Sequence, residues 1–419
     1  MPIFCDSEIN QLKQVIVHRP DSGIARITPK KSEDLLFDDI VHLPQMQAEH
    51  DVFTSVLRGL IGESNVMYAY NLLKEAIDSD SEKKAELVKM IVEYEELPIA
   101  TTQLFNETLT TPELVEVLIT GYWEKEDRIY FEPIPNFIFT RDIAVTIKDH
   151  VIITRAAKEA RFRENILTRF IFWAHPYFGT LYDQQKIINL NLIEQFPPSR
   201  WGEKVCIEGG DVMMFDPQYV LVGCSERTTD HAFHALKKVI FEKKIVENVV
   251  QVNIPSERSF MHIDTIFTRI DKDFTVVYKP IIYDGLGSYV TVFRSDGTQK
   301  VYYNVKDFIL AEINPNMKFI FSGNGISPYQ EREQWTDGCN LVALKPGVAI
   351  TYDRNPKTEK AFVQNGFAIR SALDILKDIE ENGLTLEMLE KTIITIPSSE
   401  LSRARGGSHC MTCPINREG

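Results

Sequence analysis

The stretch "SRARGGSHCMTC", residues 402–413, gathers side chains that can do chemistry near the carboxyl end of the sequence. It holds the thiols of Cys410 and Cys413, the cations of Arg403 and Arg405, and His409. Three interpretations are open: a redox or zinc Cys-x-x-Cys pair, a disordered tail with incidental cysteines, or a catalytic nucleophile carried on a loop.

A structural zinc site takes four ligands. The remaining cysteines form no second pair and lie at Cys5, Cys206, Cys224 and Cys339. A thioredoxin-type motif precedes a helix of a βαβ unit, which the residues after Cys413 do not predict. A nucleophile is the more economical interpretation of Cys410, because neighbouring cations favour the thiolate.

Two further stretches add an imidazole and carboxylates. "MHIDTIFT" places His262 and Asp264 two residues apart at the start of a predicted strand, where side chains at i and i+2 share one face. "EGGD" places Glu208 before two glycines, and Asp142 precedes another apolar run. These residues form a candidate site with Cys410.

Carboxylates that surround one small pocket repel each other unless the ligand is cationic. A planar guanidinium is the natural ligand, because its N–H groups match carboxylates bidentately. A cysteine beside a bound guanidinium can attack the central carbon. The residue types therefore indicate covalent chemistry on a guanidinium.

A repeated pattern would bring these residues together. Asp142, Asp211, Asp264 and Asn340 each precede an apolar run, a short turn and a second apolar run, which is typical of a β-hairpin. Amphipathic helices are predicted between copies, as in "RENILTRFIFWAH" and "TTDHAFHALKKVIFE", and "QLKQVIVHRP" is a candidate fifth copy. An aspartate before a strand is also ordinary turn chemistry. Carboxylates in phase in several copies favour a shared site.

Residues 45–123 do not fit the repeat. They are rich in Glu, Lys, Leu and Ala, with helix starts indicated at "DSDSEKKAEL" and "TTPELVEV". We expect an all-helical insertion over 45–123 and a catalytic domain made of 1–44 and 124–419.

The composition argues against several classes of function. The net charge of −14 disfavours binding to nucleic acid or to an anionic membrane surface. We see no secretory signal and no apolar run long enough to span a bilayer. Six scattered cysteines do not form a disulfide framework, so we expect a cytoplasmic protein.

The motifs "PNFIFTRD", "EGGDV", "HIDTIFT" and "RGGSHCM", in this order, resemble those of the arginine deiminases. "VIVHRP", "LLFDDI" and the position of the helical insertion resemble that family too, so the resemblance spans nearly the whole chain. It implies an α/β fold, a five-bladed β/α-propeller of ββαβ modules around a pseudo-fivefold axis, with the helical insertion.

The resemblance also implies roles. Cys410 is expected to be the nucleophile, His262 the general acid and then base, and Glu208 a residue that contacts substrate and orients His262. Asp142 and Asp264 are expected to clamp the guanidinium of free L-arginine, which is hydrolysed to citrulline and ammonia. Four residues are expected to hold the α-carboxylate and α-amine of the substrate: Asn136, Arg161, Arg227 and Arg405.

No metal or other cofactor is expected, and we expect a homodimer or homotetramer. The alternatives within the superfamily are hydrolysis to ornithine, amidino transfer, and hydrolysis of agmatine or methylated arginines. A catalytically silent arginine-binding protein on the same scaffold is the alternative from a different class.

Overall fold

The computed structural model describes residues 3–37 and 39–418. It is a mixed α/β structure in which the predicted hairpins are present. Each hairpin follows one of the polar residues Asp142, Asp211, Asp264 and Asn340, and its two strands pair in antiparallel fashion. The predicted helices between them are also confirmed, as α6 (Phe162–Ala174) and α8 (Asp230–Glu242).

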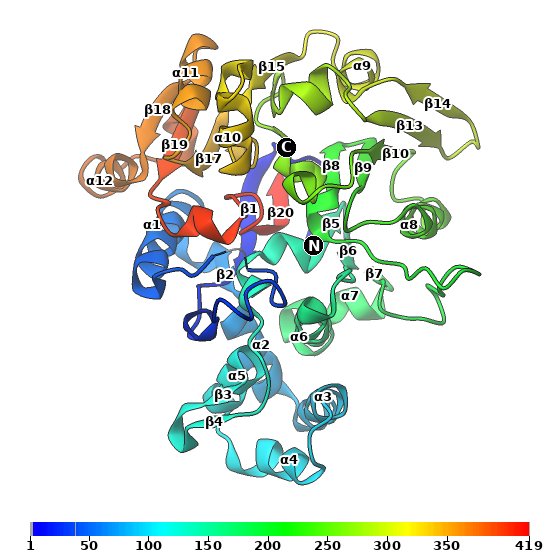
Figure 1. Ribbon diagram of the computed structural model, residues 1–419, viewed down its shortest axis with the longest axis vertical. Coiled ribbons are helices and arrows are strands. Elements are labelled where there is room, and N and C mark those ends of the chain that lie inside the picture. Colours follow the sequence, from blue (N-terminus) through cyan, green and yellow to red (C-terminus); the bar gives the residue numbers. More distant parts are fainter. Residues whose placement is uncertain (1–2, 38, 419) are drawn as a thin grey trace.

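The described residues form five sheets of three or more strands, none of them closed, arranged as Figure 1 shows. The first contains β2 (Val66–Tyr68), β1 (Gln11–Val17) and β20 (Cys413–Glu418). The second contains β5 (Ala144–Ile147), β6 (His150–Ile153) and β7 (Ile187–Asn189). The third contains β14 (Gln299–Tyr302), β13 (Tyr289–Arg294), β10 (Asn248–Asn253), β9 (Tyr219–Cys224) and β8 (Val212–Asp216).

The fourth sheet contains β11 (Phe267–Arg269), β12 (Phe274–Val277) and β15 (Lys318–Phe321). The fifth contains β16 (Val342–Lys345), β17 (Val348–Tyr352), β19 (Thr392–Ile396) and β18 (Ala368–Ser371). A short ribbon of β3 (Tyr122–Trp123) and β4 (Arg128–Ile129) is separate.

The five sheets share one pairing pattern. In each, an antiparallel pair of strands is followed by a strand that pairs in parallel with the second member of that pair. In the first sheet the pair is β20 with β1, so the two ends of the chain complete one module. The candidate fifth copy is thus a strand of this sheet, and the interpretation of the carboxyl end as a disordered tail is wrong.

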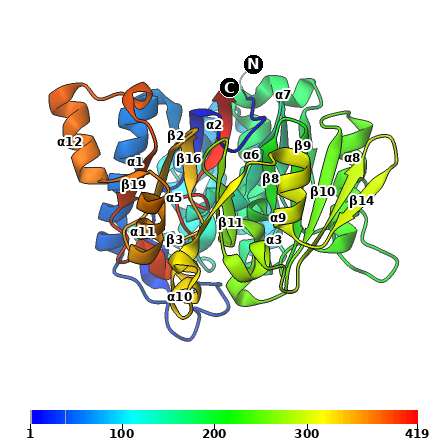
Figure 2. The same cartoon turned by 90° about the horizontal axis from the view of Figure 1, so that it is seen from above.

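Helices lie between the strands of each module. They are α7 (Gly179–Asp183), α9 (Val305–Phe308), α11 (Pro356–Gln364) and α12 (Ala372–Asn382), besides α6 and α8. The helix α10 (Tyr329–Trp335) connects the fourth sheet to the fifth. The helix α1 (Leu43–Ile61) connects β1 to β2 and packs against α12, and the two helices lie side by side at one edge in Figure 2.

Residues 69–120 form the helices α2 (Ala69–Ser79), α3 (Ser81–Tyr94), α4 (Ala100–Gln103) and α5 (Thr111–Thr120). The N-cap of α3 is Asp80, whose side chain accepts from two backbone N–H groups. Thr110 caps α5 in a capping box with Glu113. A continuous apolar core joins α2, α3 and α5 to α6.

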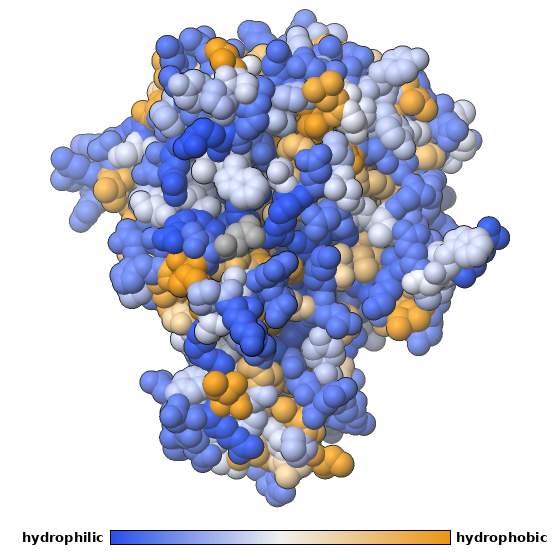
Figure 3. Space-filling model, in the orientation of Figure 1, coloured by the Kyte–Doolittle hydropathy of each residue, from blue (hydrophilic) through white to orange (hydrophobic). Residues whose placement is uncertain are grey.

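The surface in Figure 3 is mostly hydrophilic, with apolar side chains scattered over it. No helix in residues 3–37 and 39–418 combines the length and the apolar character that crossing a bilayer requires.

Candidate active site

The fold brings all five residues of the predicted catalytic set to one place. Asp142, Glu208 and Asp264 lie in or beside 3₁₀ turns that precede β5, β8 and β11, and Cys410 lies just before β20. His262 immediately precedes the turn that holds Asp264. Each of the five side chains is at most 6% exposed. Asp142, Glu208 and Asp264 come together because they lie at corresponding places, just before the first strand of a hairpin.

His262 lies between two of the carboxylates. Its Nε2 donates to Oε2 of Glu208 at 2.9 Å, and its Nδ1 is 3.8 Å from Oδ1 of Asp142. Burial alone would lower the pKa of His262, but the carboxylates of Asp142, Glu208 and Asp211 outweigh it and raise the pKa to about 10. His262 is therefore an imidazolium at neutral pH, able to donate a proton.

Cys410 lies against the third carboxylate. Its Sγ donates to Oδ2 of Asp264 at 3.4 Å and accepts from Nδ2 of Asn340 at 3.1 Å. Burial, followed by the negative charges of Asp264 and Asp142, raises the pKa of the Cys410 thiol well above its ordinary value. Without a ligand the sulfur is thus a thiol.

His409 supports Asp264 from the side away from His262. Its Nδ1 is 2.9 Å from Oδ2 of Asp264, and its Nε2 is 3.1 Å from Oε2 of Glu8. Burial alone would raise the pKa of Asp264, but His409 holds it below its ordinary value. The Oδ1 atom of Asp264 has no hydrogen-bond partner within the described part of the chain. It can accept from a ligand.

Gly210 allows the close approach of these groups. A Cβ atom there would lie 2.7 Å from Nδ1 of His262 and 2.9 Å from Oδ1 of Asp264. The backbone N–H of Gly210 also donates to Oδ1 of Asp142 at 3.1 Å. The glycine of "EGGD" therefore adjoins three members of the set.

The residues expected to bind the α-carboxylate and α-amine line the same cavity. Arg161 Nη1 donates to Oδ2 of Asp142 at 2.7 Å and lies 3.4 Å from Oε2 of Glu208. Arg227 Nη1 is 3.8 Å from Oε1 of Glu208. Asn136 Nδ2 donates to the Leu35 carbonyl at 2.7 Å, and the guanidinium of Arg405 lies 3.3 Å from the centre of the Trp335 ring.

This cavity holds only about 30 Å³, enough for about one water molecule. The guanidinium of Arg161 lies on two of the carboxylates expected to surround the substrate. Asp142, Glu208 and His262 are also close enough together to hold a metal ion. The cation they already contact is a guanidinium, which agrees with the chemistry inferred from the residue types.

Two sequence expectations were wrong. His262 and Asp264 do not share a strand face: a 3₁₀ turn spans Ile263–Thr265 and directs His262 to Glu208 and Asp264 to Cys410. Arg403 does not support a thiolate, because its guanidinium pairs with Asp39 and Glu400.

Asn340 and Asp211 were missed as site residues, although both begin predicted hairpins. Asn340 contacts Cys410 twice: Nδ2 donates to Sγ, and Oδ1 accepts from the backbone N–H at 3.1 Å. Asp211 accepts from the Ile263 backbone N–H at 2.9 Å and from the Ser225 hydroxyl at 2.6 Å, which ties the His262 turn to β9. Their place in the repeat was the available signal.

Solved structures of two enzymes have a similar fold. A DDAH from Pseudomonas aeruginosa complexed with citrulline is 12% identical, with a TM-score of 0.51 over 96% of this chain and 99% of that one. The amidinotransferase SxtG from Microseira wollei is 14% identical, with a TM-score of 0.51 over 100% and 98% of the two chains. At these identities the likeness concerns the fold alone.

The family is shown by sequence. The arginine deiminase family model matches residues 33–124 and 120–417. The arginine deiminase of Limosilactobacillus fermentum is 33% identical over 100% of this chain and 99% of its own. That of Listeria monocytogenes is 33% identical over 98% and 97% of the two chains. The chain belongs to the arginine deiminase family.

The contacts of Asn340 predict a kinetic effect. Asn340→Ala should lower kcat about tenfold or more, because it removes a hydrogen bond that would stabilise the sulfur anion. Steady-state kinetics with a thermal melt would measure this. Asn340→Asp is the matched variant: it keeps an acceptor for the Cys410 N–H but loses the donor, and should be impaired as well. Wild-type kcat in both variants would contradict the assignment.

Proposed function

We propose that this protein hydrolyses free L-arginine to L-citrulline and ammonia. Membership of the arginine deiminase family supports the overall reaction. The observation that carries the proposal is the convergence of a thiol, an imidazolium and two carboxylates on one cavity, with a third carboxylate, that of Asp264, in contact with the thiol. A catalytically silent arginine-binding protein would have no need of this constellation.

The guanidinium would bind between Asp142 and Asp264, whose free Oδ1 atom supplies an acceptor. The Cys410 thiolate then attacks the guanidinium carbon and forms a C–S bond. His262, as imidazolium, gives its proton to the departing nitrogen, the C–N bond breaks, and ammonia leaves. Neutral His262 next takes a proton from water, the hydroxide attacks the amidino-thioether, and the C–S bond breaks to release citrulline and the thiolate.

The substrate would supply the charge that activates the nucleophile. The pKa of the Cys410 thiol is raised by burial and by adjacent carboxylates, and a bound guanidinium would place a positive charge beside the sulfur. The thiolate form of Cys410 is then favoured only when a substrate guanidinium is bound. The carboxylates themselves hold ground state and transition state alike, so they contribute mainly to binding.

Substrate binding would require a rearrangement. The cavity is too small for arginine, and Arg161 contacts the carboxylates that the substrate guanidinium would use. We infer that Arg161 moves to the α-carboxylate of arginine, where Arg227, Asn136 and Arg405 also bind. Arg405 has a backbone φ of 61° and is followed directly by Gly406 and Gly407. Movement of Arg405 would open the entrance to the catalytic cavity.

The larger organisation is part of the proposal. The shared strand pattern of the five sheets supports a five-bladed β/α-propeller of ββαβ modules, with Cys410 and the carboxylates near its pseudo-fivefold axis. We further propose a catalytic domain of residues 1–44 and 124–419 and a helical insertion of 45–123. In this division both α1 and the strand β2 fall within the insertion, although β2 pairs with β1 in the first sheet.

The remaining properties are proposed on narrower support. The six cysteines are all free, which fits a reducing, cytoplasmic location. Assembly as a homodimer or homotetramer is also proposed. The catalytic site described above is formed by residues of a single chain.

Product analysis tests the reaction, and Cys410→Ala tests the nucleophile. Mass spectrometry after incubation with L-arginine should give citrulline; ornithine would instead indicate double hydrolysis. Cys410→Ala should abolish ammonia release yet bind arginine in calorimetry, because only the attacking atom is lost. Ammonia release at the wild-type rate would remove Cys410 from the mechanism.

Arg227→Ala should separate recognition of the two ends of the substrate. We expect the affinity for arginine to fall at least about tenfold more than that for agmatine, which lacks the carboxylate. Isothermal titration in the Cys410→Ala background would measure both. Equal losses for the two ligands would place Arg227 elsewhere.

The pKa of His262 sets the alkaline limit of activity. In the wild type, kcat/KM should fall as pH rises toward about 10, where His262 loses the proton that it gives to the leaving group. Glu208→Gln removes a carboxylate that raises this pKa, so the falling limb should move to lower pH. The pH profile of kcat/KM measures it, and a limb that stays in place or moves upward would contradict the pairing.

A further inference from the structure

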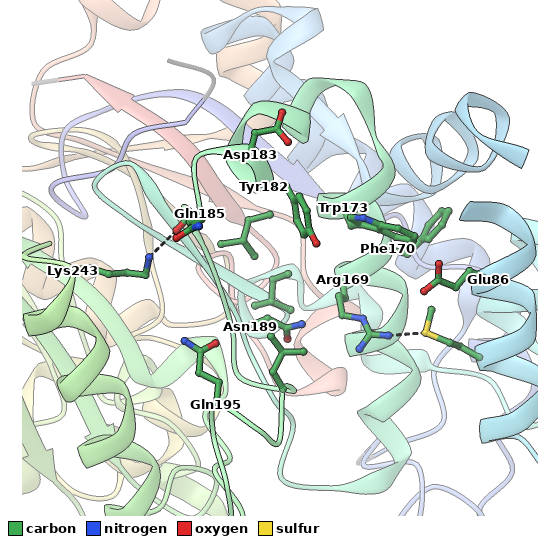
Figure 4. A pocket seen from close by; sticks show the side chains of 14 residues that line it. Glu86, Arg169, Phe170, Trp173, Tyr182, Asp183, Gln185, Asn189, Gln195 and Lys243 are labelled. Carbon is green, nitrogen blue, oxygen red and sulfur yellow. Dashed lines mark hydrogen bonds between the residues drawn. The ribbon is translucent and has the colours of Figure 1, made fainter. Parts of the chain in front are cut away.

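A second, larger cavity lies outside the catalytic site. It has a volume of about 810 Å³ and opens between α3 of the helical region and the segment formed by α6, α7 and β7 (Figure 4). Its size is that of small-molecule sites in general. None of the residues proposed for catalysis or arginine binding lines it.

A guanidinium with no hydrogen-bonded carboxylate among the described residues lies in this cavity, although the negative charge of Glu86 acts on it. Arg169, on α6, is partly buried, and its one hydrogen bond within the described chain runs from Nη2 to the thioether Sδ of Met90 at 2.6 Å. A thioether is a weak acceptor. Burial lowers the pKa of Arg169, which reflects the cost of holding this charge away from water. A ligand anion would offset that cost.

A carboxylate lies on the opposite wall. Glu86, on α3, is exposed at the mouth of the cavity and has no ion pair within the described chain. Figure 4 shows Glu86 and Arg169 on the two facing helices α3 and α6. The two opposite charges face one space without meeting in an ion pair of 4.0 Å or less. A ligand that carries both charges would satisfy each.

Aromatic residues also line the cavity, of which Trp173 is half-buried and Phe170 almost fully buried. Phe170 and Trp173 follow Arg169 on α6, and their ring centroids lie 6.2 Å apart in an edge-to-face arrangement. Lys83 covers one face of Trp173, with Nζ 5.1 Å from the ring centre. The Tyr182 hydroxyl points into the cavity in Figure 4. A large apolar or aromatic side chain would pack here.

We propose that this cavity binds a free α-amino acid with a large apolar side chain. Arg169 would take the α-carboxylate, Glu86 the α-ammonium, and the wall of Phe170 and Trp173 the side chain. Neither the charge of Arg169 nor that of Glu86 alone specifies the class of ligand. The separated pair of opposite charges, with aromatic residues lining the same cavity, matches a zwitterion better than it matches a simple anion or cation.

The position of α6 gives this site a route to the catalytic cavity. The helix begins at Phe162, directly after Arg161, and Glu164 in its first turn accepts from Nε of Arg161 at 3.0 Å. Arg169, Phe170 and Trp173 lie farther along the same helix. A ligand that shifts α6 would therefore move Arg161, so occupancy should change KM for arginine.

Calorimetric titration with L-tryptophan is the test. Two fragments separate the charges: indole-3-propionate lacks the ammonium and tryptamine lacks the carboxylate, and both should bind about tenfold more weakly or worse. Arg169→Gln should weaken the binding of L-tryptophan but leave the affinity for tryptamine unchanged. Glu86→Gln should weaken the binding of L-tryptophan but leave the affinity for indole-3-propionate unchanged. Arg128→Gln, in β4, and Glu124→Gln, in the turn before it, are matched controls: they remove the same charges from residues that do not line the cavity, and should bind like the wild type.

Binding of L-tryptophan at the catalytic cavity has to be distinguished from binding at the cavity lined by Arg169 and Glu86. L-Tryptophan should bind Arg227→Ala as well as the wild type, and should not be displaced by arginine from Cys410→Ala. Loss of binding in Arg227→Ala would place the amino acid in the catalytic cavity and overturn the proposal. So would the absence of saturable binding by L-tryptophan, L-phenylalanine and L-leucine, or binding that neither Arg169→Gln nor Glu86→Gln weakens. None of these results bears on whether the enzyme makes citrulline.

Discussion

Three carboxylates buried at one place are the constraint on which the site depends. Asp142, Glu208 and Asp264 are each at most 6% exposed, and their mutual repulsion in a poorly solvated cavity must be offset by nearby cations. His262 and Arg161 supply that charge to Asp142 and Glu208, while Asp264 is stabilised by a hydrogen bond with His409. The site is thus built around cations, and in the proposed mechanism one of them is the substrate.

The same constraint explains why the thiol is not activated in advance. Cys410 is buried beside Asp264, so its ionisation would add a fourth negative charge to the cluster. Activation by a resident cation, as Arg403 and Arg405 suggested from sequence, does not occur: Arg403 pairs with Asp39 and Glu400, and Arg405 lies over Trp335. A guanidinium bound between Asp142 and Asp264 would favour the thiolate of Cys410 over the thiol. Formation of the nucleophile is thus linked to substrate binding.

Much of this arrangement could be predicted because the signals are local. The hairpins after Asp142, Asp211 and Asp264 follow from two apolar runs and the turn residues between them, within about a dozen positions, and their phase placed the carboxylates together. The pairing of β20 with β1 could not be predicted, since it joins residues at opposite ends of the chain. The contact of Arg161 with Asp142 is also non-local and depends on how α6 sits against β5. Asn340 was overlooked because an amide occupies the position that carries a carboxylate in other modules.

The reactivity of Cys410 toward two electrophiles of the same shape tests the central claim most directly. Chloroacetamidine is cationic and chloroacetamide is neutral, and the rate at which each alkylates Cys410 would be measured across pH by peptide mass spectrometry. If the buried carboxylates keep the sulfur protonated until a cation arrives, the amidine should react rapidly at neutral pH, and the amide only as pH rises above the ordinary thiol range. Equal rates at neutral pH, with the amide already at its plateau, would show a standing thiolate and contradict the account.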